Sequence, residues 1–557
     1  MSSIKSQKII RQYVGEIPIL QNTVQRLDIK TILATYIRSH GNEKVNAIDS
    51  LMLLIYNIAC GRQPLYELEE WTRKTNPRMF GFSSFEQGVF SDDRFARALD
   101  KLYQVDRASL MTEIVITTVN AIHLKLNQVH NDSTSVKAFG RIPRKTKTGL
   151  ELKKGKSKDH RPDLKQLVYC LSVSADGFVP IHYKTYSGNV TDDTTHIETW
   201  STLKKIVGRT DFLYVADCKV CTDKQLSYIV SKNGKVITTI PETWSEVQHF
   251  KEELRRNARK KRILMRVRHS ENKNKYNTFS CFEGHYETQK RAYLIYWIHS
   301  SRKKEQDYLR RQHFIEKTEN ELSELSVKLN KRNLNSKDAI SQKVNAILTK
   351  YRVRNFYTIT IKQSEFRYRV QDGKGRPGPN TTYRIETEKK YFLSWSQDKK
   401  ALAREKNVDG IFPLLCTDKN IDAKSALNAY KYQPRLEKRF SQFKSIHNAA
   451  PLLFKNIERV EAMMFLFFIA LIIQAVIERE VRNNMKKNEI EKLPLYPENR
   501  LSYHPTTAKI FERFCDVSTY LLVEGSEVKQ KFADSLNEIQ LTILKLLNMT
   551  ENQYWPN

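Results

Sequence analysis

The sequence lacks the features of a secreted or membrane-spanning protein. Its seven cysteines are scattered and odd in number, which fits a reducing cytoplasm better than a disulfide framework. Cys218 and Cys221 are spaced as C-x2-C, but no second Cys or His pair follows at zinc spacing, so we expect no zinc site. No signal peptide is recognisable at the N-terminus. The most apolar run, Met463 to Ile477, is shorter than the ~20 residues of a bilayer span and therefore predicts a buried helix and no membrane partner.

Acidic residues are scarce relative to basic ones. Lys and Arg number 94 against 62 Asp and Glu, which gives a net charge of +32 at pH 7. Such a surplus is typical of proteins that bind a polyanion, and nucleic acid is the default partner. The glycine-rich stretch Asp372 to Gly378 lacks the Gly-Lys-Ser/Thr and the following helix of a P-loop, so it is predicted to be an ordinary loop.

The pattern of apolar positions divides the chain into segments of different character. Helical spacing dominates the first segment, strands appear from about residue 126, and a long helix from about 304 to 330 interrupts the α/β pattern. We predict a helical N-terminal domain (1–115), a first part of an α/β core (116–241), an insertion domain (242–408), a second part of the core (409–485) and a C-terminal helical region (486–557).

Within the first part of the core, the elements are predicted to follow the order strand, strand, strand, helix, strand, helix, strand. That is the order of the ribonuclease H-like fold, a mixed five-stranded sheet with helical crossovers in which the first and fourth strands are neighbours. Asp132 lies on the first predicted strand, Gln128 to Val136, and Asp217 follows the fourth, Phe212 to Ala216. Two acids 85 residues apart in the sequence are therefore expected to meet at one edge of the sheet.

A second group of residues is spaced for one helical face. Tyr430, Gln433, Glu437 and Lys444 would fall within an arc of about 60° on a single α-helix. Proline is tolerated only in the first helical turn, so Pro434 predicts a helix that begins near Lys431 to Gln433, with Tyr430 at its threshold. A surface amphipathic helix would give the same spacing, and the acids upstream are what favour a functional interpretation.

Together these residues resemble the signature of DDE transposases of bacterial insertion sequences, specifically the cut-and-paste branch with a Tyr-x2-Arg-x3-Glu-x6-Lys helix. The resemblance is strong over 125–241 and 409–480 and looser in the N-terminal and insertion regions. Gln433 stands where that family has arginine, and Arg435 points about 200° around a helix from it, so it cannot take its place.

The resemblance implies that Asp132, Asp217 and Glu437 are the catalytic acids and the metal ligands. They would hold two Mg²⁺ ions, for which Mn²⁺ can substitute, with Asp132 bridging both ions. Two-metal sites of this kind cleave phosphodiesters without a covalent intermediate, and Mg²⁺ prefers oxygen ligands.

The activity implied by the resemblance is DNA transposition. The enzyme would bind the inverted-repeat ends of its own element, cleave them hydrolytically and join the 3′-hydroxyl ends to target DNA. The implied partners are double-stranded DNA and a second copy of the chain in a synaptic homodimer, and the implied location is the bacterial cytoplasm, at the nucleoid. The N-terminal domain would bind the element ends, although a purely structural helical cap would have the same helical pattern.

Several polar side chains around the implied site are candidates for contacts with DNA phosphates. On the signature helix, Lys444 would contact DNA as a point charge and Tyr430 as a hydrogen-bond donor, and Gln433 would contact DNA without contributing a charge. The segment from 141 to 165 carries ten Lys or Arg against three acids. A solvated hairpin loop would have the same composition, but its position after the Asp132 strand predicts DNA contacts from Lys153, Lys154, Lys156, Lys158 and Arg161.

Two alternatives to the transposase interpretation follow from the same residues. One is a catalytically inactive relative that occupies element ends as a repressor, which the missing arginine at position 433 keeps open. The other is a ribonuclease H-fold nuclease acting on branched or hybrid substrates, against which the large insertion and the Tyr-Glu-Lys helix both argue.

Overall fold

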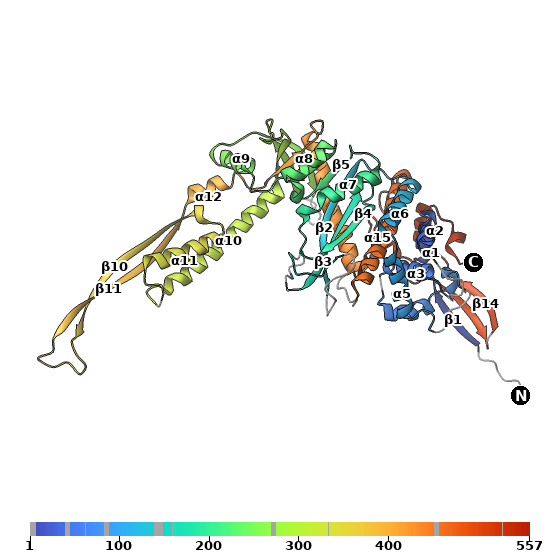
Figure 1. The fold of residues 1–557 in the computed structure, drawn as a ribbon, viewed down its shortest axis with the longest axis horizontal. Helices are drawn as coiled ribbons and strands as arrows, with labels where there is room; N and C mark the ends of the chain where they lie inside the picture. Colours follow the sequence, from blue (N-terminus) through green and yellow to red (C-terminus); the bar gives the residue numbers. More distant parts are fainter. Residues whose placement is uncertain are drawn as a thin grey trace. The chain divides into compact units, whose positions relative to one another are not determined.

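The protein is a mixed α/β structure with two compact units. Unit 1 combines Met1–Thr238 with Asn428–Asn557, and unit 2 is Thr239–Leu427. The computed structural model, drawn in Figure 1, describes residues 7–38, 45–61, 63–82, 88–138, 149–156, 158, 161, 163–268, 275–331, 333–449, 456–525 and 527–556. Residues 141–148 of the predicted basic loop lie outside these ranges.

Five strands of unit 1 form a mixed sheet in the order β4-β3-β2-β5-β6. Strand β2 pairs antiparallel with β3 and parallel with β5. The predicted order of elements and the adjacency of the first and fourth strands are both confirmed. The bounds are β2 (Gln128–Ala138), β3 (Lys165–Ser174), β4 (Pro180–Ser187), α7 (His196–Val207), β5 (Leu213–Ala216), α8 (Asp223–Ser231) and β6 (Lys235–Thr239).

The central helix of unit 1 is α15 (Ile457–Lys487), which contains the predicted buried apolar run. By length and composition alone α15 could cross a membrane, but its most apolar window is entirely buried within the protein. Aromatic rings of this helix pack on the sheet, for example Phe468 at 4.8 Å from Tyr183 of β4. The prediction of a buried helix is confirmed, although the helix extends well beyond the apolar run.

The turn between β3 and β4 fixes one end of α15. Gly177 in this turn has φ +81°, and a Cβ there would lie 2.7 Å from the Arg479 side chain. Arg479 donates to both carboxylate oxygens of Asp176 at 3.1 and 2.7 Å. Burial favours a higher pKa for Asp176, but the bonds from Arg479 and from the Lys125 backbone outweigh it, and the pKa is lowered. The turn therefore binds α15 through an ionised carboxylate.

The two ends of the chain meet in a small sheet that the sequence interpretation missed. Strand β1 (Gln7–Tyr13) pairs antiparallel with β13 (Ser518–Glu524), which also pairs with β14 (Glu527–Ala533). The predicted helical N-terminal domain and C-terminal helical region therefore also contain strands. The cause of the omission is physical: β1 has no clear apolar alternation, and its partner strand lies about 500 residues away in the sequence.

Helices account for most of the remaining structure at the two ends. They are α1 (Ile17–Arg26), α2 (Ile29–Tyr36), α3 (Ala47–Ala59), α4 (Leu68–Lys74), α5 (Asp92–Gln104), α6 (Arg107–Ala121), α16 (Thr507–Phe511), α17 (Glu538–Leu546) and α18 (Glu551–Tyr554).

Unit 2 contains a sheet and a long helical hairpin with a β-ribbon. The sheet order is β12-β9-β8-β7. The predicted long helix is confirmed as α10. The bounds are α9 (Ser245–Arg256), β7 (Lys261–Arg268), β8 (Tyr276–Phe282), β9 (Leu294–Ser300), α10 (Ser301–Val327), α11 (Lys337–Lys350), β10 (Tyr357–Gln371), β11 (Tyr383–Gln397), α12 (Lys399–Glu405) and β12 (Ile411–Cys416).

A buried ion pair attaches α14 (Gln433–Ser441) to α15. Arg439 and Glu478 are both almost fully buried, with 3.0 Å between Nη1 and Oε2. The other guanidinium nitrogens of Arg439 donate to the carbonyls of Phe178 and Gly177 at 3.1 and 3.2 Å. The pair is therefore compensated by further hydrogen bonds, which a buried ion pair requires.

Removing the Arg439 guanidinium should destabilise unit 1 strongly. Arg439→Met leaves the Glu478 carboxylate buried without its main counter-charge, and we expect a loss of about 3 kcal/mol in the free energy of unfolding. Urea denaturation followed by circular dichroism measures this loss. Lys438→Met is the matched control, because Lys438 is the exposed neighbour on the same helix. Equal stability of the two variants would contradict the assigned role.

Candidate active site

The signature residues do not lie on one continuous α-helix. Tyr430 is in the last turn of α13 (Ala423–Lys431), α14 begins at Gln433 with Pro434 in its first turn, and Lys444 lies in a π-helical turn, Gln442–Ile446. The predicted start of the helix is confirmed. The prediction of a single 60° face is wrong, because the proline interrupts the helix before Gln433 and the π-helical turn changes the angular spacing before Lys444.

The first two predicted acids follow paired positions on neighbouring parallel strands. Asn131 of β2 is in register with Ala216 of β5, and Asp132 and Asp217 are the next residues on the two chains. Asp132 is partly exposed in a stretch of β2 that is otherwise buried. Asp217 caps the short helical turn that follows β5, accepting a hydrogen bond from the Lys219 backbone at 3.0 Å. The two carboxylates thus belong to the same edge of the sheet.

The Gln433 side chain connects α14 to the strand that carries Asp132. Its Oε1 lies 3.0 Å from His130 Nδ1, and its Nε2 donates to the Asn131 carbonyl at 2.9 Å. Because Oε1 can only accept, His130 carries its proton on Nδ1. Burial lowers the pKa of His130 to about 4, so the imidazole is neutral at pH 7. Gln433, predicted as a DNA contact, is here engaged within the protein.

Glu437 lies on a helix, α14, that runs along β2, the strand of Asp132. Gln433, at the start of the helix, contacts residues 130 and 131 of β2. Beyond the end of the helix, the Phe443 ring stacks at 4.5 Å on Tyr169, whose register partner on β2 is Thr134. The helix therefore runs along β2 in the same direction as the strand. Glu437, between these two contacts, is exposed.

Lys158 neutralises the first acid in the structure. Its Nζ lies 3.0 Å from Asp132 Oδ1 and donates to the Ser133 carbonyl at 2.5 Å, while its backbone N–H donates to Ser135 Oγ at 3.0 Å. Lys158 was predicted to contact DNA, but here its ammonium provides the counter-charge of a predicted metal ligand.

Lys153 of the basic segment pairs with Gln166 of β3. Lys153 and Gln166 exchange backbone hydrogen bonds, and a Cβ at Gly155 would lie 1.9 Å from the Gly188 carbonyl oxygen, so only glycine permits this approach. Burial and Asp217 raise the pKa of Cys218, and Lys156 opposes that shift. Lys156 is therefore close to the Asp217 end of β5.

The remaining predicted basic contacts differ in whether they are already paired. Lys153 pairs with Glu151 at 2.7 Å, and Arg161 donates to both oxygens of Asp163 at 2.9 and 2.7 Å. Lys154 and Lys156 are exposed. Tyr430 and Lys444 are half-buried on either side of α14.

The three predicted acids are brought to neighbouring elements but are not assembled into a metal centre. Within the described ranges, no group of three or more His, Cys, Asp or Glu side chains is arranged to hold a metal ion. Convergence of Asp132, Asp217 and Glu437 would bring three negative charges together, which is unfavourable without a cation between them. In this arrangement Lys158 balances the charge of Asp132.

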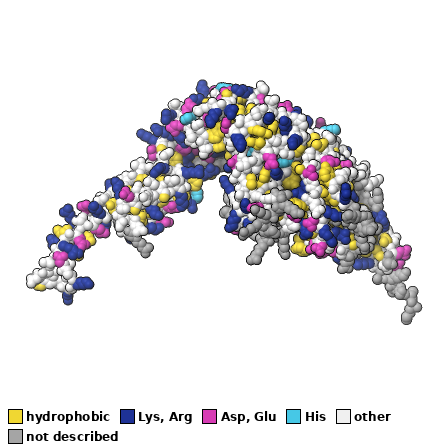
Figure 2. All heavy atoms as spheres, in the orientation of Figure 1, with side chains coloured by type: hydrophobic (Ala, Val, Ile, Leu, Met, Phe, Trp, Pro, Cys, Tyr) yellow, Lys and Arg dark blue, Asp and Glu magenta, His cyan; other side chains and the backbone are white. Residues whose placement is uncertain are grey.

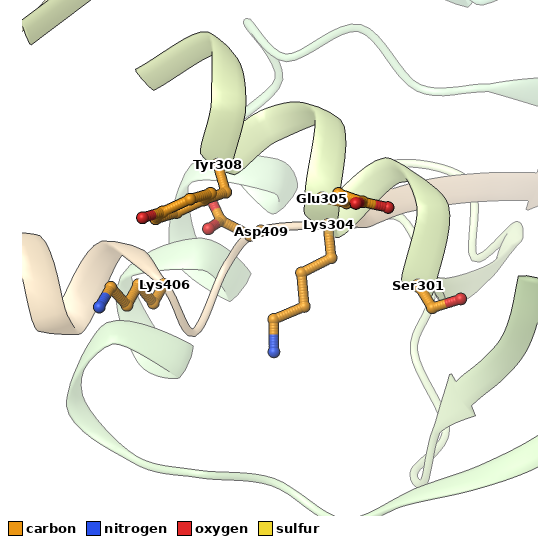
Figure 3. Close-up of a pocket in the computed structure, with 6 residues that line it drawn as sticks. All are labelled: Ser301, Lys304, Glu305, Tyr308, Lys406 and Asp409. Carbon is orange, nitrogen blue, oxygen red and sulfur yellow. The ribbon is translucent and has the colours of Figure 1, made fainter. Parts of the chain in front are cut away.

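A pocket in unit 2 offers no comparable chemistry. Its volume is about 440 Å³, and Figure 3 shows its lining from α10 and from the segment before β12. Asp409 in this lining forms a buried bidentate pair with Arg311, with both distances 2.6 Å. Its carboxylate is therefore already neutralised. The pocket contains none of the predicted site residues and is lined by Ser301, Lys304, Glu305, Tyr308, Lys406 and Asp409.

Residues missed by the sequence interpretation are His130 and Arg439. His130 is a buried polar residue on the same face of β2 as Asp132. Its position two residues before Asp132 in a predicted strand is the sequence feature that could have identified it. Arg439 is one of several basic residues on α14, and its burial depends on α15, which is remote in the sequence.

We expect Gln433 to contribute to the stability of the folded protein rather than to the binding of DNA. Gln433→Leu leaves His130 Nδ1 and the Asn131 carbonyl without their partner, and should lower the free energy of unfolding by about 1–3 kcal/mol. Glu437→Gln, which changes an exposed position one turn along the same helix, serves as the control and should not destabilise the protein. Urea unfolding of the metal-free proteins measures both. A Gln433→Leu variant as stable as the wild type would refute this role.

Comparisons with known proteins give limited information. A family model described as "Domain of unknown function (DUF4277)" matches residues 9–116, less than half of the chain. No curated protein matches. One similar solved structure is described as "Cryo-EM structure of piggyBac transposase synaptic complex with hairpin DNA (SNHP)", with 13% identity and a TM-score of 0.27. The match covers 51% of this chain and 58% of that chain, so it spans little more than half of the other protein. A similarity this weak supports no inference about fold or function.

Proposed function

We propose that this protein is a DDE-type DNA transposase of a bacterial insertion sequence, with a ribonuclease H-like core. The observation that supports the proposal best is the arrangement of three elements. Asp132 and Asp217 follow paired positions on the adjacent parallel strands β2 and β5, and α14, which carries Glu437, runs along β2. Acids 85 and 220 residues apart in sequence thus come from neighbouring elements of one sheet edge.

The donor set fits Mg²⁺. The three side chains offer only carboxylate oxygens, the ligands that Mg²⁺ prefers. The ion pair between Lys158 and Asp132 supports the proposal, because Asp132 already has a cation beside it. Asp132, Asp217 and Glu437 would hold two ions, which when bound supply an activated water or 3′-hydroxyl and stabilise the leaving oxygen.

Other residues of the chain would bind and orient the DNA. Lys154 and Lys156 are exposed and can bind phosphates as point charges. Lys444 and Tyr430 would contact the same strand, and Gln433 would hold α14 on β2 rather than contact DNA. The proposed assembly is a homodimer on paired element ends in the bacterial cytoplasm.

Cleavage of the flanking inverted repeat tests the proposal. We expect the wild type to cut a labelled duplex at the repeat end with Mg²⁺ and not with EDTA. Asp217→Asn and Glu437→Gln should each lower the cleavage rate at least ~100-fold without loss of binding, because each removes a charged metal ligand. Asp211→Asn, which changes an exposed acid just before β5, is the matched control and should cut like the wild type.

The alternatives give different results in the same assay. A repressor would bind the repeat ends in all four forms and cut with neither Mg²⁺ nor Mn²⁺. A nuclease of the same fold would cut branched DNA or RNA–DNA hybrids in preference to repeat ends.

Lys158 gives a second test, which does not depend on cleavage. If its ammonium competes with the metal for Asp132, Lys158→Met should bind Mn²⁺ about threefold to tenfold more tightly, as expected for a partly exposed ion pair worth ~1 kcal/mol. Titration calorimetry without DNA measures the affinity. Lys154→Met is the control and Asp132→Asn should abolish the effect. Unchanged or weaker Mn²⁺ binding by Lys158→Met would show that Lys158 does not compete.

A further inference from the structure

The ribbon of β10 and β11 is half supported and half free. Its register runs from Tyr357 opposite Gln397 to Gln371 opposite Tyr383. The base packs on α10 and α11, where Tyr357 and Tyr391 join a buried cluster with Leu322 and Val344. Beyond Gln363 nearly all β10 side chains are exposed, whichever face they occupy. A segment of paired strands thus projects from unit 2 without any described element covering it (Figure 1).

The two faces of the distal ribbon differ in charge balance. Alternation along the strands places Arg367, Arg369 and Lys389 on one face, which we call the basic face, with Glu365 opposite Lys389 as its acid. Among the described residues, none of these three cations has a carboxylate oxygen within 4.0 Å of its charged nitrogen atoms. The basic face also presents Tyr383 and Ile385, which are 50% and 69% exposed.

The opposite face, here the paired face, carries Lys362 near the base of the ribbon and Arg384 and Lys390 beyond it, and the last two are compensated. Arg384 pairs with Glu386 at 2.7 Å and with Asp372 at 3.4 Å, and Lys390 pairs with Glu388 at 3.1 Å. Lys390 also lies 5.3 Å from the centre of the Phe366 ring. Beyond Gln363 the net positive charge of the ribbon is therefore concentrated on the basic face and at the tip, where Lys374 and Arg376 are exposed. Figure 2 shows Lys and Arg side chains at the far end of the ribbon.

We propose that the basic face of the distal ribbon is a binding surface for double-stranded DNA. The major groove of B-DNA admits a two-stranded β-ribbon. Side chains two residues apart on a strand, such as Arg367 and Arg369, lie ~7 Å apart, and each guanidinium can bind a phosphate through two N–H groups. The tip residues Lys374 and Arg376 extend the same positive surface. The occupant is DNA because uncompensated cations, not the exposed apolar side chains alone, distinguish this face from the other.

This surface is separate from the predicted acids, so the inference does not rest on the proposed catalytic function. A chain that binds DNA and cuts nothing would still use the ribbon, and a transposase could cut element ends without it.

A comparison of the two faces in the full-length protein tests the inference. The basic-face variant replaces Arg367, Arg369 and Lys389 by Ala, and the matched control replaces Lys362, Arg384 and Lys390, three cations of the paired face, by Ala. Binding of a fluorescent duplex containing the flanking sequence is measured by anisotropy over a range of salt. We expect the basic-face variant to bind about tenfold or more weakly at ~0.1 M salt, with a salt slope reduced by about 2–3, and the control to change by less than about threefold.

Each result decides the inference. Wild-type affinity in the basic-face variant would overturn it, and equal losses in both variants would overturn the assignment of a particular face. Circular dichroism and the thermal midpoint of each variant verify that the ribbon remains folded. The cleavage assay on the wild type is run in parallel. Weakened binding by the basic-face variant, without any cleavage by the wild type, would support the ribbon inference and refute the transposase proposal. Normal cleavage by the wild type, with unchanged binding by the basic-face variant, would support the transposase proposal and refute the ribbon inference.

Discussion

The candidate site depends on how α14 is held against β2. The helix has nine residues, and its apolar side chains are Leu436 and Phe440, so it would not be stable in isolation. Two sets of polar contacts compensate for this. Gln433 bonds to His130 and Asn131 at the start of the helix, and Arg439 forms its buried pair with Glu478 nearer the end. These two attachments lie on either side of Glu437 in the sequence of α14. They hold the position of Glu437, the one predicted acid that a helix rather than the sheet contributes.

The identity of residue 433 follows from its neighbour. Gln433 accepts from His130 Nδ1 and donates to a carbonyl, and His130 Nε2 lies 2.8 Å from the side-chain nitrogen of Gln128, from which it can accept. An arginine has only donors and could not accept the His130 proton, so a chain with arginine at 433 needs a different hydrogen-bond arrangement at position 130. The absence of arginine at position 433 is therefore explained by local hydrogen bonding and does not by itself indicate an inactive protein.

Much of the sheet was predictable because its signals are local. The apolar run before Asp217 and the strand around Asp132 are each recognisable within ten residues, and the rules of crossover connection then place the two strands side by side. Other features depend on distant parts of the chain. Strand β1 has no apolar pattern of its own and is a strand because it pairs with β13. Arg439 is buried only because α15 supplies Glu478. The π-helical turn at Lys444 could not be predicted from spacing, which assumes a uniform helix.

The distribution of charge links the core with the ribbon. A protein with a net charge of +32 must either compensate its cations or present them to a partner. At the sheet edge the cations are largely compensated, since Lys158, Lys153 and Arg161 each have a carboxylate within 3.0 Å. On the basic face of the ribbon the cations outnumber the acids and remain unpaired. A polyanion therefore gains more from contact with the ribbon, while the cations at the sheet edge must first exchange their carboxylates for phosphates. That exchange would release Asp132 from Lys158, so binding of DNA next to the acids would also make Asp132 available to a metal ion.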